Sequence, residues 1–115
     1  MKNIPLLIVV VFASCATSKN QRGPATSSLC IAQLIKTFKD APQQNPPRSI
    51  YRYFYKNKTV FYVTPICCDQ FSDLYDENCK LLGHPDGGFT GKGDGLFIDF
   101  EEAKSAEKLI WKDDR

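Results

Sequence analysis

The chain has 115 residues with fifteen basic and thirteen acidic side chains, which gives a net charge of +2, and 43% of its residues are hydrophobic. The basic residues form no stripe along the sequence, so a nucleic-acid or other polyanion partner is not expected. A peripheral membrane helix is also excluded, because no apolar helical pattern carries Lys and Arg along one face.

The N-terminus has the pattern of an export signal. Residues 1–3 are positively charged, and residues 4–12 form an uncharged, mostly aliphatic run that is too short to cross a hydrocarbon core of roughly 30 Å. Small residues precede Cys15, as in the bacterial lipobox, where the cysteine is diacylated with chains such as palmitate and becomes the new N-terminus. We therefore expect residues 1–14 to be a lipoprotein signal peptide and Cys15 a membrane anchor. The alternative is a plain secretory signal that is cut nearby.

Residues 15–27 are polar and lack any large apolar side chain, so they cannot offset the entropy of being ordered. They are predicted to be a flexible tether. Residues 28–115 then form a single small domain, of a size at which covalent cross-links assist a marginal core. Without residues 1–14 the net charge is +1, and four further cysteines remain for cross-links: Cys30, Cys67, Cys68 and Cys79.

The first predicted helix begins at Ser28, which is a suitable N-cap. Its apolar side chains repeat at the spacing of one helical face, and they are Ile31, Leu34, Ile35 and Phe38. Because this stripe is one-sided, the helix must pack on a partner, to which Cys30 in the first turn can be cross-linked. Residues 40–49 contain three prolines and are expected to form an extended crossing loop.

Two β-hairpins are predicted to follow the helix. Residues 50–55 and 60–64 are rich in aromatic and β-branched side chains and flank a turn that contains Asn57. Residues 71–75 and 79–82 form a second, shorter pair of strands around a polar turn. The two hairpins together indicate an antiparallel sheet.

The remaining segments complete the expected fold. Residues 96–100 are an apolar return segment, 101–106 one or two helical turns, 108–112 a closing strand and 113–115 a solvated end. The predicted fold class is α+β, with an antiparallel sheet of four or five strands, one N-terminal helix packed on it, and disulfide bonds between them.

Tyrosines alternate along the first predicted strand, so Tyr51, Tyr53 and Tyr55 share one face of the sheet. Such a row could act as a stacking platform for sugars or bases. The favoured interpretation is that the rings cover one face of a small sheet and keep their hydroxyl groups in water.

In an oxidising compartment, four cysteines in a domain of this size predict two disulfides. Adjacent strand residues point to opposite faces and a bridge between neighbours is strained, which disfavours a bond between Cys67 and Cys68. Two pairings remain open: Cys30–Cys67 with Cys68–Cys79, or Cys30–Cys68 with Cys67–Cys79. A metal or redox role is the alternative, but a bare Cys-Cys lacks the C-x-x-C spacing typical of those sites.

Residues 67–95 contain the only histidine and six of the seven glycines. The glycines of residues 83–95 favour a tight surface loop, and the segment lacks the phosphate-loop pattern. The candidate binding residues are Asp69, Gln70, His84, Asp86, Lys92 and Asp94. Two alternatives are a calcium ion held near Asp86, Asp94 and Asp99, and a hydrolase that uses His84 with a nucleophile such as Cys68 or Ser72. No catalytic residue, metal or cofactor is assigned.

Five segments carry a resemblance over nearly all of residues 28–115: Asn45-Pro46-Pro47, Cys67-Cys68-Asp69-Gln70-Phe71, Leu74-Tyr75-Asp76, residues 85–95 and Leu109-Ile110-Trp111-Lys112-Asp113. Together they resemble an uncharacterised domain family of small Bacteroidetes lipoproteins. The resemblance implies an envelope location and no particular activity. It also implies that one bridge is missing here, because family members often have cysteines at the positions of Gly83 and Phe97.

These observations favour a non-enzymatic module of the cell envelope. It would be attached to the membrane through a lipid on Cys15 and would present the Gly83–Gly95 loop to an envelope protein or glycan. The alternatives are a protease-inhibitor-like domain, a calcium-dependent binding module and a small hydrolase using His84.

Overall fold

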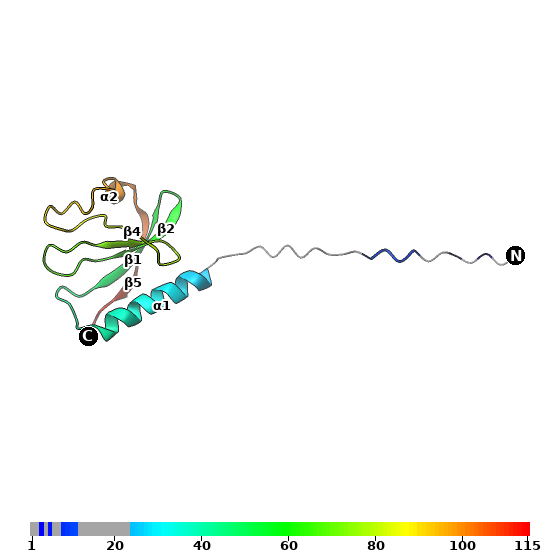
Figure 1. The fold of residues 1–115 in the computed structure, drawn as a ribbon, viewed down its shortest axis with the longest axis horizontal. Helices are drawn as coiled ribbons and strands as arrows, with labels where there is room; N and C mark the ends of the chain where they lie inside the picture. The colour runs from blue at the N-terminus through cyan, green and yellow to red at the C-terminus, as the bar shows by residue number, and fades with distance from the viewer. Residues whose placement is uncertain (1–2, 4, 6–7, 12–23) are drawn as a thin grey trace.

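The computed structural model describes residues 3, 5, 8–11 and 24–115. The proposed anchor Cys15 and the first part of the predicted tether lie outside the described residues. Within the described part the chain forms the helices α1 (Pro24–Asp40) and α2 (Phe100–Ala103) and five strands: β1 (Ser49–Tyr55), β2 (Lys58–Val63), β3 (Asp73–Tyr75), β4 (Leu81–Gly83) and β5 (Ser105–Lys112) (Figure 1). No helix in this described part is long and apolar enough to span a membrane.

The strands form one antiparallel sheet in the order β4-β3-β2-β1-β5. β1 and β2 are joined by a tight turn in which Lys56 and Asn57 both have positive φ, as a two-residue hairpin turn requires. The closing strand β5 returns to pair with β1, so the last strand lies beside the first. The predicted α+β fold with an N-terminal helix is therefore confirmed.

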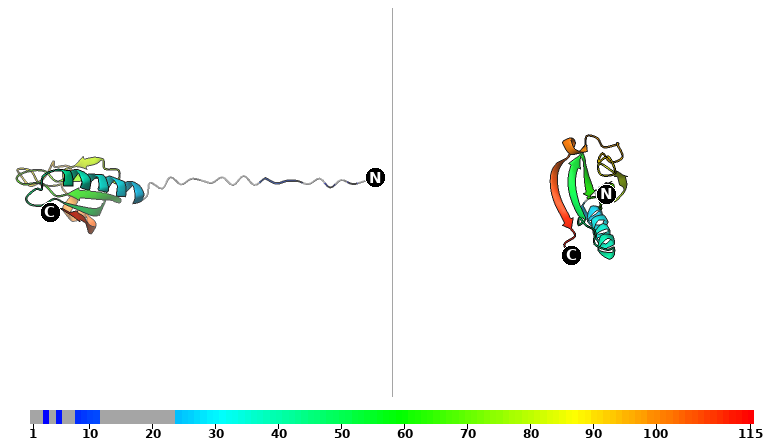
Figure 2. Two further views of the ribbon diagram at one scale, coloured as in Figure 1. Left: turned by 90° about the horizontal axis from the view of Figure 1, so that it is seen from below. Right: turned by 90° about the vertical axis from the view of Figure 1, so that its left-hand side faces the viewer.

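One face of the sheet is covered by α1, which Figure 2 shows running along the strands. Its apolar stripe packs on side chains from β1, β2, β3 and β5, and the buried residues of this cluster are Ile31, Ile50, Phe61 and Val63. The helix begins at Pro24 and not at Ser28, so the expected N-cap lies inside the helix and the end of the predicted tether is helical. Proline suits the first turn of a helix, because the N–H that it lacks would be unpaired there.

The other face carries the tyrosines. Tyr53 and Tyr55 are each only 5% exposed and pack with Val60, Leu74 and Phe100. The prediction that the hydroxyl groups stay in water is wrong, and the buried rings cannot serve as a stacking platform. The Tyr53 hydroxyl donates to Glu107, 2.5 Å away, and the Tyr55 hydroxyl donates to Asp99, 2.6 Å away.

The segment expected to be an apolar return does not join the sheet. Residues 96–99 form turns that lead into α2, whose first residue, Phe100, is buried against Tyr53 and Tyr55 with ring centroids 5.7 and 5.1 Å away. Buried Phe100 and half-buried Phe97 therefore attach this segment to the tyrosine face, while Leu96 and Ile98 are exposed to solvent.

The disulfide pairings expected from the sequence are also wrong. Cys30 of α1 is joined to Cys79, and Cys67 is joined to its neighbour Cys68. β2 ends at Val63, so the adjacent cysteines lie in a turn, where the alternation of strand side chains does not apply. Cys79 lies in the β3–β4 turn beside α1, at a Cα–Cα distance of 5.6 Å from Cys30.

Of residues 113–115, which the sequence predicted to be a solvated end, Asp114 and Arg115 are exposed but Asp113 is buried. Asp113 is 4% exposed, and its carboxylate accepts hydrogen bonds from the Arg115 guanidinium at 2.8 and 2.9 Å. Arg115 also donates to the carbonyls of Phe38, Lys39 and Ala41 at the C-terminal end of α1. These carbonyls have no partner within the helix, so Arg115 caps α1.

Candidate functional site

The glycine loop, residues 83–95, is held to the segment that precedes β3. The amide of Ser72 donates to the carbonyl of Asp86 (3.1 Å), and the amide of Gly88 donates to the carbonyl of Gln70 (3.0 Å). Phe71 and Gly87 face each other across this short antiparallel bridge. Backbone hydrogen bonds therefore give the loop a defined shape although it lacks regular secondary structure.

Asp94 closes the two ends of the loop. Its carboxylate accepts the amide of His84 at 2.8 Å and the amide of Leu96 at 2.9 Å, and its own amide donates to the His84 carbonyl at 2.9 Å. Burial acts to raise the pKa of Asp94, but these backbone hydrogen bonds outweigh burial and hold the pKa below its ordinary value. The predicted binding residue Asp94 is thus occupied within the loop.

Gly93 lies where only glycine fits. Its φ is +61°, and a Cβ atom there would overlap the His84 carbonyl and lie 2.7 Å from the Asp86 nitrogen. The close approach of the two sides of the loop depends on this missing side chain.

His84 is placed by its neighbours and does not face a nucleophile. Its Nδ1 lies 2.7 Å from the carbonyl of Ser72 and 3.1 Å from Oδ1 of Asp73, and its ring stacks on Phe71. Because both partners accept hydrogen bonds, Nδ1 carries the proton. The Ser72 hydroxyl is fully buried and bonded to the backbone of Asp86. With Cys68 in a disulfide, neither nucleophile considered for a hydrolase is available.

Asp86 is hydrogen-bonded to a half-buried tyrosine. The Tyr62 hydroxyl donates to its carboxylate, with distances of 2.8 and 2.9 Å to the two oxygens. Burial and this hydrogen bond both raise the pKa of Tyr62, so the phenol stays neutral at physiological pH. The carboxylate of Asp86 is therefore oriented by the sheet beneath it.

A pocket of about 500 Å³ opens between the glycine loop and the start of α2. Its lining residues are Pro85, Asp86, Gly91, Lys92, Phe97, Ile98, Phe100 and Glu101. Of the predicted binding residues, this pocket brings together Asp86 and Lys92. The sequence reasoning missed Phe97 and Glu101, because it assigned them to a return segment and a helical turn with no link to the loop.

Two further predicted residues belong to a different hollow. Asp69 and Gln70 lie with Cys67, Cys68, Gly87 and Gly88 around a depression of about 230 Å³. It shares none of its lining residues with the larger pocket. Four of the predicted binding residues are thus divided between the two hollows, and His84 and Asp94 line neither.

The carboxylates expected near a calcium ion each have separate protein partners. Asp86 accepts from Tyr62, Asp94 from backbone amides, and Asp99 from Tyr55 and from Lys56 at 3.4 Å. Among the described residues, no group of three or more His, Cys, Asp or Glu side chains has the arrangement of a metal site.

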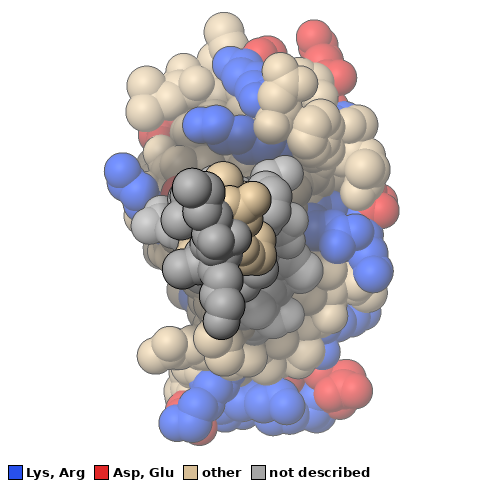
Figure 3. Space-filling model, turned by 90° about the vertical axis from the view of Figure 1, so that its right-hand side faces the viewer, with Lys and Arg blue, Asp and Glu red and all other residues tan. Residues whose placement is uncertain are grey.

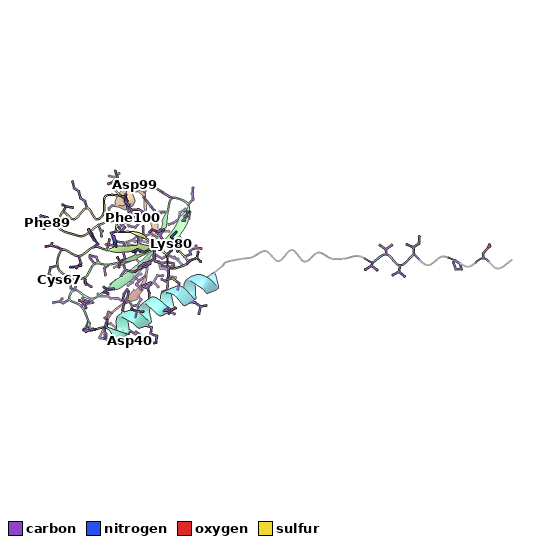
Figure 4. The ribbon with its side chains drawn as sticks, viewed as in Figure 1. Asp40, Cys67, Lys80, Phe89, Asp99 and Phe100 are labelled. Atoms are coloured by element: carbon purple, nitrogen blue, oxygen red, sulfur yellow. A yellow bond between two sulfur atoms is a disulfide. The ribbon has the colours of Figure 1, made fainter. Side chains whose placement is uncertain are left out.

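Apolar side chains project from the loop and the turn that follows it. Phe89 is 93% exposed, Leu96 73% and Ile98 86%. Figure 4 shows Phe89 at the end of the domain away from the start of α1. Figure 3 shows the opposite side, where Lys and Arg side chains form separate groups with Asp and Glu beside some of them.

The two positions that the resemblance relates to an additional bridge lie side by side. A Cβ atom on Gly83 would lie 2.5 Å from a carbon of the Phe97 ring and 2.6 Å from the Asp94 carboxylate. In this chain the Phe97 ring fills the space beside Gly83, so the start of the loop is held against α2's leading turn by packing.

A comparison with known families gives one match, to a family model described as a domain of unknown function, which covers residues 36–113. No curated protein and no solved structure matches the chain. The matched segment includes all five strands, the glycine loop and both hollows, whereas Cys30 lies outside it. Because the match covers more than half of the chain, this protein belongs to the DUF6970 family, a domain of unknown function.

Proposed function

We propose that this protein is a non-enzymatic binding module of the bacterial cell envelope, anchored by a lipid on Cys15, which presents its glycine loop to a protein or glycan partner. The observation that carries this proposal is the exposure of Phe89, Leu96 and Ile98 on a backbone that is tied down by hydrogen bonds. Large apolar side chains that are highly exposed on an ordered loop and the turn after it are candidates for contact with a partner.

The loop is suited to binding because its shape is already formed. Ordering a flexible segment on association costs free energy, and a loop held by its own hydrogen bonds avoids much of that cost. Asp94 and Gly93 provide this order in the free protein. An aromatic side chain such as Phe89 on an ordered loop is a suitable anchor for a partner.

The pocket beside the loop supplies polar groups for the same partner. Lys92 and Glu101 are charged groups in its lining, and Asp86 presents a carboxylate oriented by Tyr62. Phe97 and Phe100 provide an apolar wall. A few placed polar groups around an apolar wall are typical of sites for polar ligands such as sugars.

The direction of the loop agrees with attachment at the N-terminal side. Phe89 lies at the far end of the domain from the first turn of α1 (Figures 1 and 4). A lipid anchor that precedes α1 would leave this end of the domain facing away from the membrane. The resemblance to small Bacteroidetes lipoproteins supports the same arrangement.

Photo-crosslinking in intact cells tests the binding surface. The full chain would carry benzoylphenylalanine in place of Phe89, with Phe54 on β1, which is 44% exposed, as the matched control position. In parallel, the purified full chain and its Phe89→Ala and Lys92→Ala variants would be tested for retention on isolated envelope polysaccharides. We expect a discrete adduct from position 89 alone, or glycan retention that both variants weaken. Equal labelling from both positions, together with unchanged or absent retention, would contradict the proposal.

The anchor is tested separately by metabolic labelling with an alkyne analogue of palmitate. We expect the wild-type chain to carry the label and to sediment with membranes, and the Cys15→Ser variant to lose both properties. Label retained by this variant, or an unlabelled wild-type chain, would show that Cys15 is not the lipid site.

A further inference from the structure

The two disulfides differ in what they can stabilise. Cys30–Cys79 joins residues that are 49 positions apart, whereas Cys67–Cys68 joins neighbours. A cross-link stabilises a fold mainly by restricting the unfolded chain, and this effect grows with the length of the closed loop. In the unfolded chain, the bond between Cys67 and Cys68 restricts almost nothing beyond one peptide unit. Stabilisation of the fold therefore does not explain why the Cys67–Cys68 bond is present.

The two disulfides also differ in access. Cys67 and Cys68 are exposed, and they line the shallow hollow of about 230 Å³ beside the glycine loop. Cys30 and Cys79 are half-buried where α1 meets the β3–β4 turn, with Leu34 and Tyr75 beside them. Both pairs border a hollow, of about 410 Å³ at Cys30–Cys79, but Cys67 and Cys68 are themselves exposed. Attack on a disulfide requires that a thiolate reach one of its sulfur atoms, so the adjacent pair is the more accessible one.

We propose that Cys67–Cys68 is a thiol–disulfide exchange site whose co-reactant is an external dithiol, while Cys30–Cys79 is a permanent cross-link. A thiolate of the dithiol attacks one sulfur of the pair, the bond between Cys67 and Cys68 breaks, and the other cysteine leaves as a thiolate. The second thiolate of the dithiol then attacks the mixed disulfide and releases the remaining cysteine. Two electrons and two protons pass to the pair, and the dithiol becomes a disulfide.

The redox state of this pair bears directly on the glycine loop. The carbonyl of Gln70, two residues after Cys68, accepts the amide of Gly88 at 3.0 Å. Gly87 packs so closely on this segment that a Cβ there would overlap the Gln70 carbonyl and lie 3.1 Å from the Phe71 Cα. Opening the disulfide frees the turn at residues 67–69 and loosens the bond that holds Gly88.

Graded reduction of the full chain tests the proposal. The protein would be equilibrated with increasing dithiothreitol, and in a parallel arm with reduced thioredoxin as a protein dithiol, then alkylated and mapped by peptide mass spectrometry. We expect Cys67 and Cys68 to be labelled together at a dithiol concentration roughly tenfold or more below that needed for Cys30 and Cys79. In a separate sample, the dithiol is removed and a mild oxidant is added before alkylation. The Cys67–Cys68 bond should then re-form, so that neither cysteine is labelled. Reduction in either arm supports the proposal, and the two arms separate a small dithiol from a protein one.

Hydrogen exchange supplies the second measurement. The Gly88 amide should exchange faster once Cys67 and Cys68 are reduced, while a β1–β2 amide such as that of Val60 stays unchanged. The Cys67→Ser/Cys68→Ser variant should show the fast Gly88 exchange without any dithiol. If that variant does not fold, graded labelling of the wild-type chain still decides the matter. Labelling of Cys30 and Cys79 at the same or lower dithiol concentration, a pair that does not re-form, or four thiols that label without reductant would overturn the proposal.

Discussion

The two faces of the sheet are held in different ways. On one face α1 packs through aliphatic and aromatic side chains, and its links to the rest of the domain are the Cys30–Cys79 bond and the Arg115 cap. On the other face no long helix is present among the described residues, and residues 84–99 with α2 cover the tyrosines. There three tyrosine hydroxyls donate to Glu107, Asp99 and Asp86.

The comparison shows that a glycine-rich loop can cover one face of a sheet in place of a helix. A helix satisfies its own backbone hydrogen bonds, so it needs only an apolar stripe to pack. A glycine-rich segment must find partners for its amides and carbonyls elsewhere. Asp94 and the segment at residues 70–72 supply those partners. The loop face should therefore depend on polar groups and the helix face on apolar packing and its cross-link.

The largest effect is expected from removing the helix-face cross-link. The Cys30→Ser/Cys79→Ser variant should lose about 4 kcal/mol of unfolding free energy, because the bond closes a long loop, whereas Cys67→Ser/Cys68→Ser should lose only about 1 kcal/mol. Denaturant unfolding of both variants measures the difference. Equal losses would show that loop closure does not distinguish the two bonds.

The next largest effect is expected at the close approach within the loop. Gly93→Ala should cost about 3 kcal/mol, since the left-handed conformation costs roughly 1–2 kcal/mol and the new Cβ meets the His84 backbone. Gly91→Ala is the matched control, because Gly91 also has positive φ but nothing lies within 4 Å of its Cβ position. Similar unfolding free energies for the two variants would contradict the role given to Gly93.

A smaller effect should separate the tyrosines of the two faces. Tyr62→Phe should destabilise the domain by about 1 kcal/mol, because the half-buried Asp86 carboxylate loses its donor. Tyr75→Phe on the helix face should be close to neutral, since its hydroxyl makes no hydrogen bond among residues 29–115, whose side chains the structure describes. Thermal unfolding compares the two substitutions, and a larger loss for Tyr75→Phe would reverse the assignment.

The smallest effect is expected on the stability of the domain at acidic pH. Backbone hydrogen bonds hold the pKa of Asp94 below its ordinary value despite the opposing effect of burial, and a hydrogen bond from Tyr55 lowers the pKa of Asp99. A lowered pKa contributes stability that is present above the unfolded value, roughly pH 4, and is lost as the pH falls through the folded value. The melting temperature, measured between about pH 7 and pH 2, should decrease mainly below about pH 4. Asp94→Asn should be less stable at pH 7 and show a shallower fall in acid; a parallel curve would exclude Asp94 as a source.

Much of the fold could be predicted because it follows from local periodicity. The stripe from Ile31 to Phe38 required a helix with a partner, and the alternation in residues 50–63 required a hairpin with two different faces. The glycines of residues 83–95 indicated a surface loop. The candidate site was only partly visible: Asp86 and Lys92 were named, but the pocket walls at Phe97 and Glu101 were not.

The sequence by itself determined the class of fold, the order of its elements and the position of the loop, since spacing and composition act over a few neighbouring residues. Only the tertiary structure decided which distant groups meet. Cys79 reaches Cys30 because of where α1 lies on the sheet, and the tyrosine hydroxyls bond to carboxylates 24 to 54 residues away. A hydroxyl group or a thiol has no local pattern that names its partner, because the partner is selected by the packing of the whole domain.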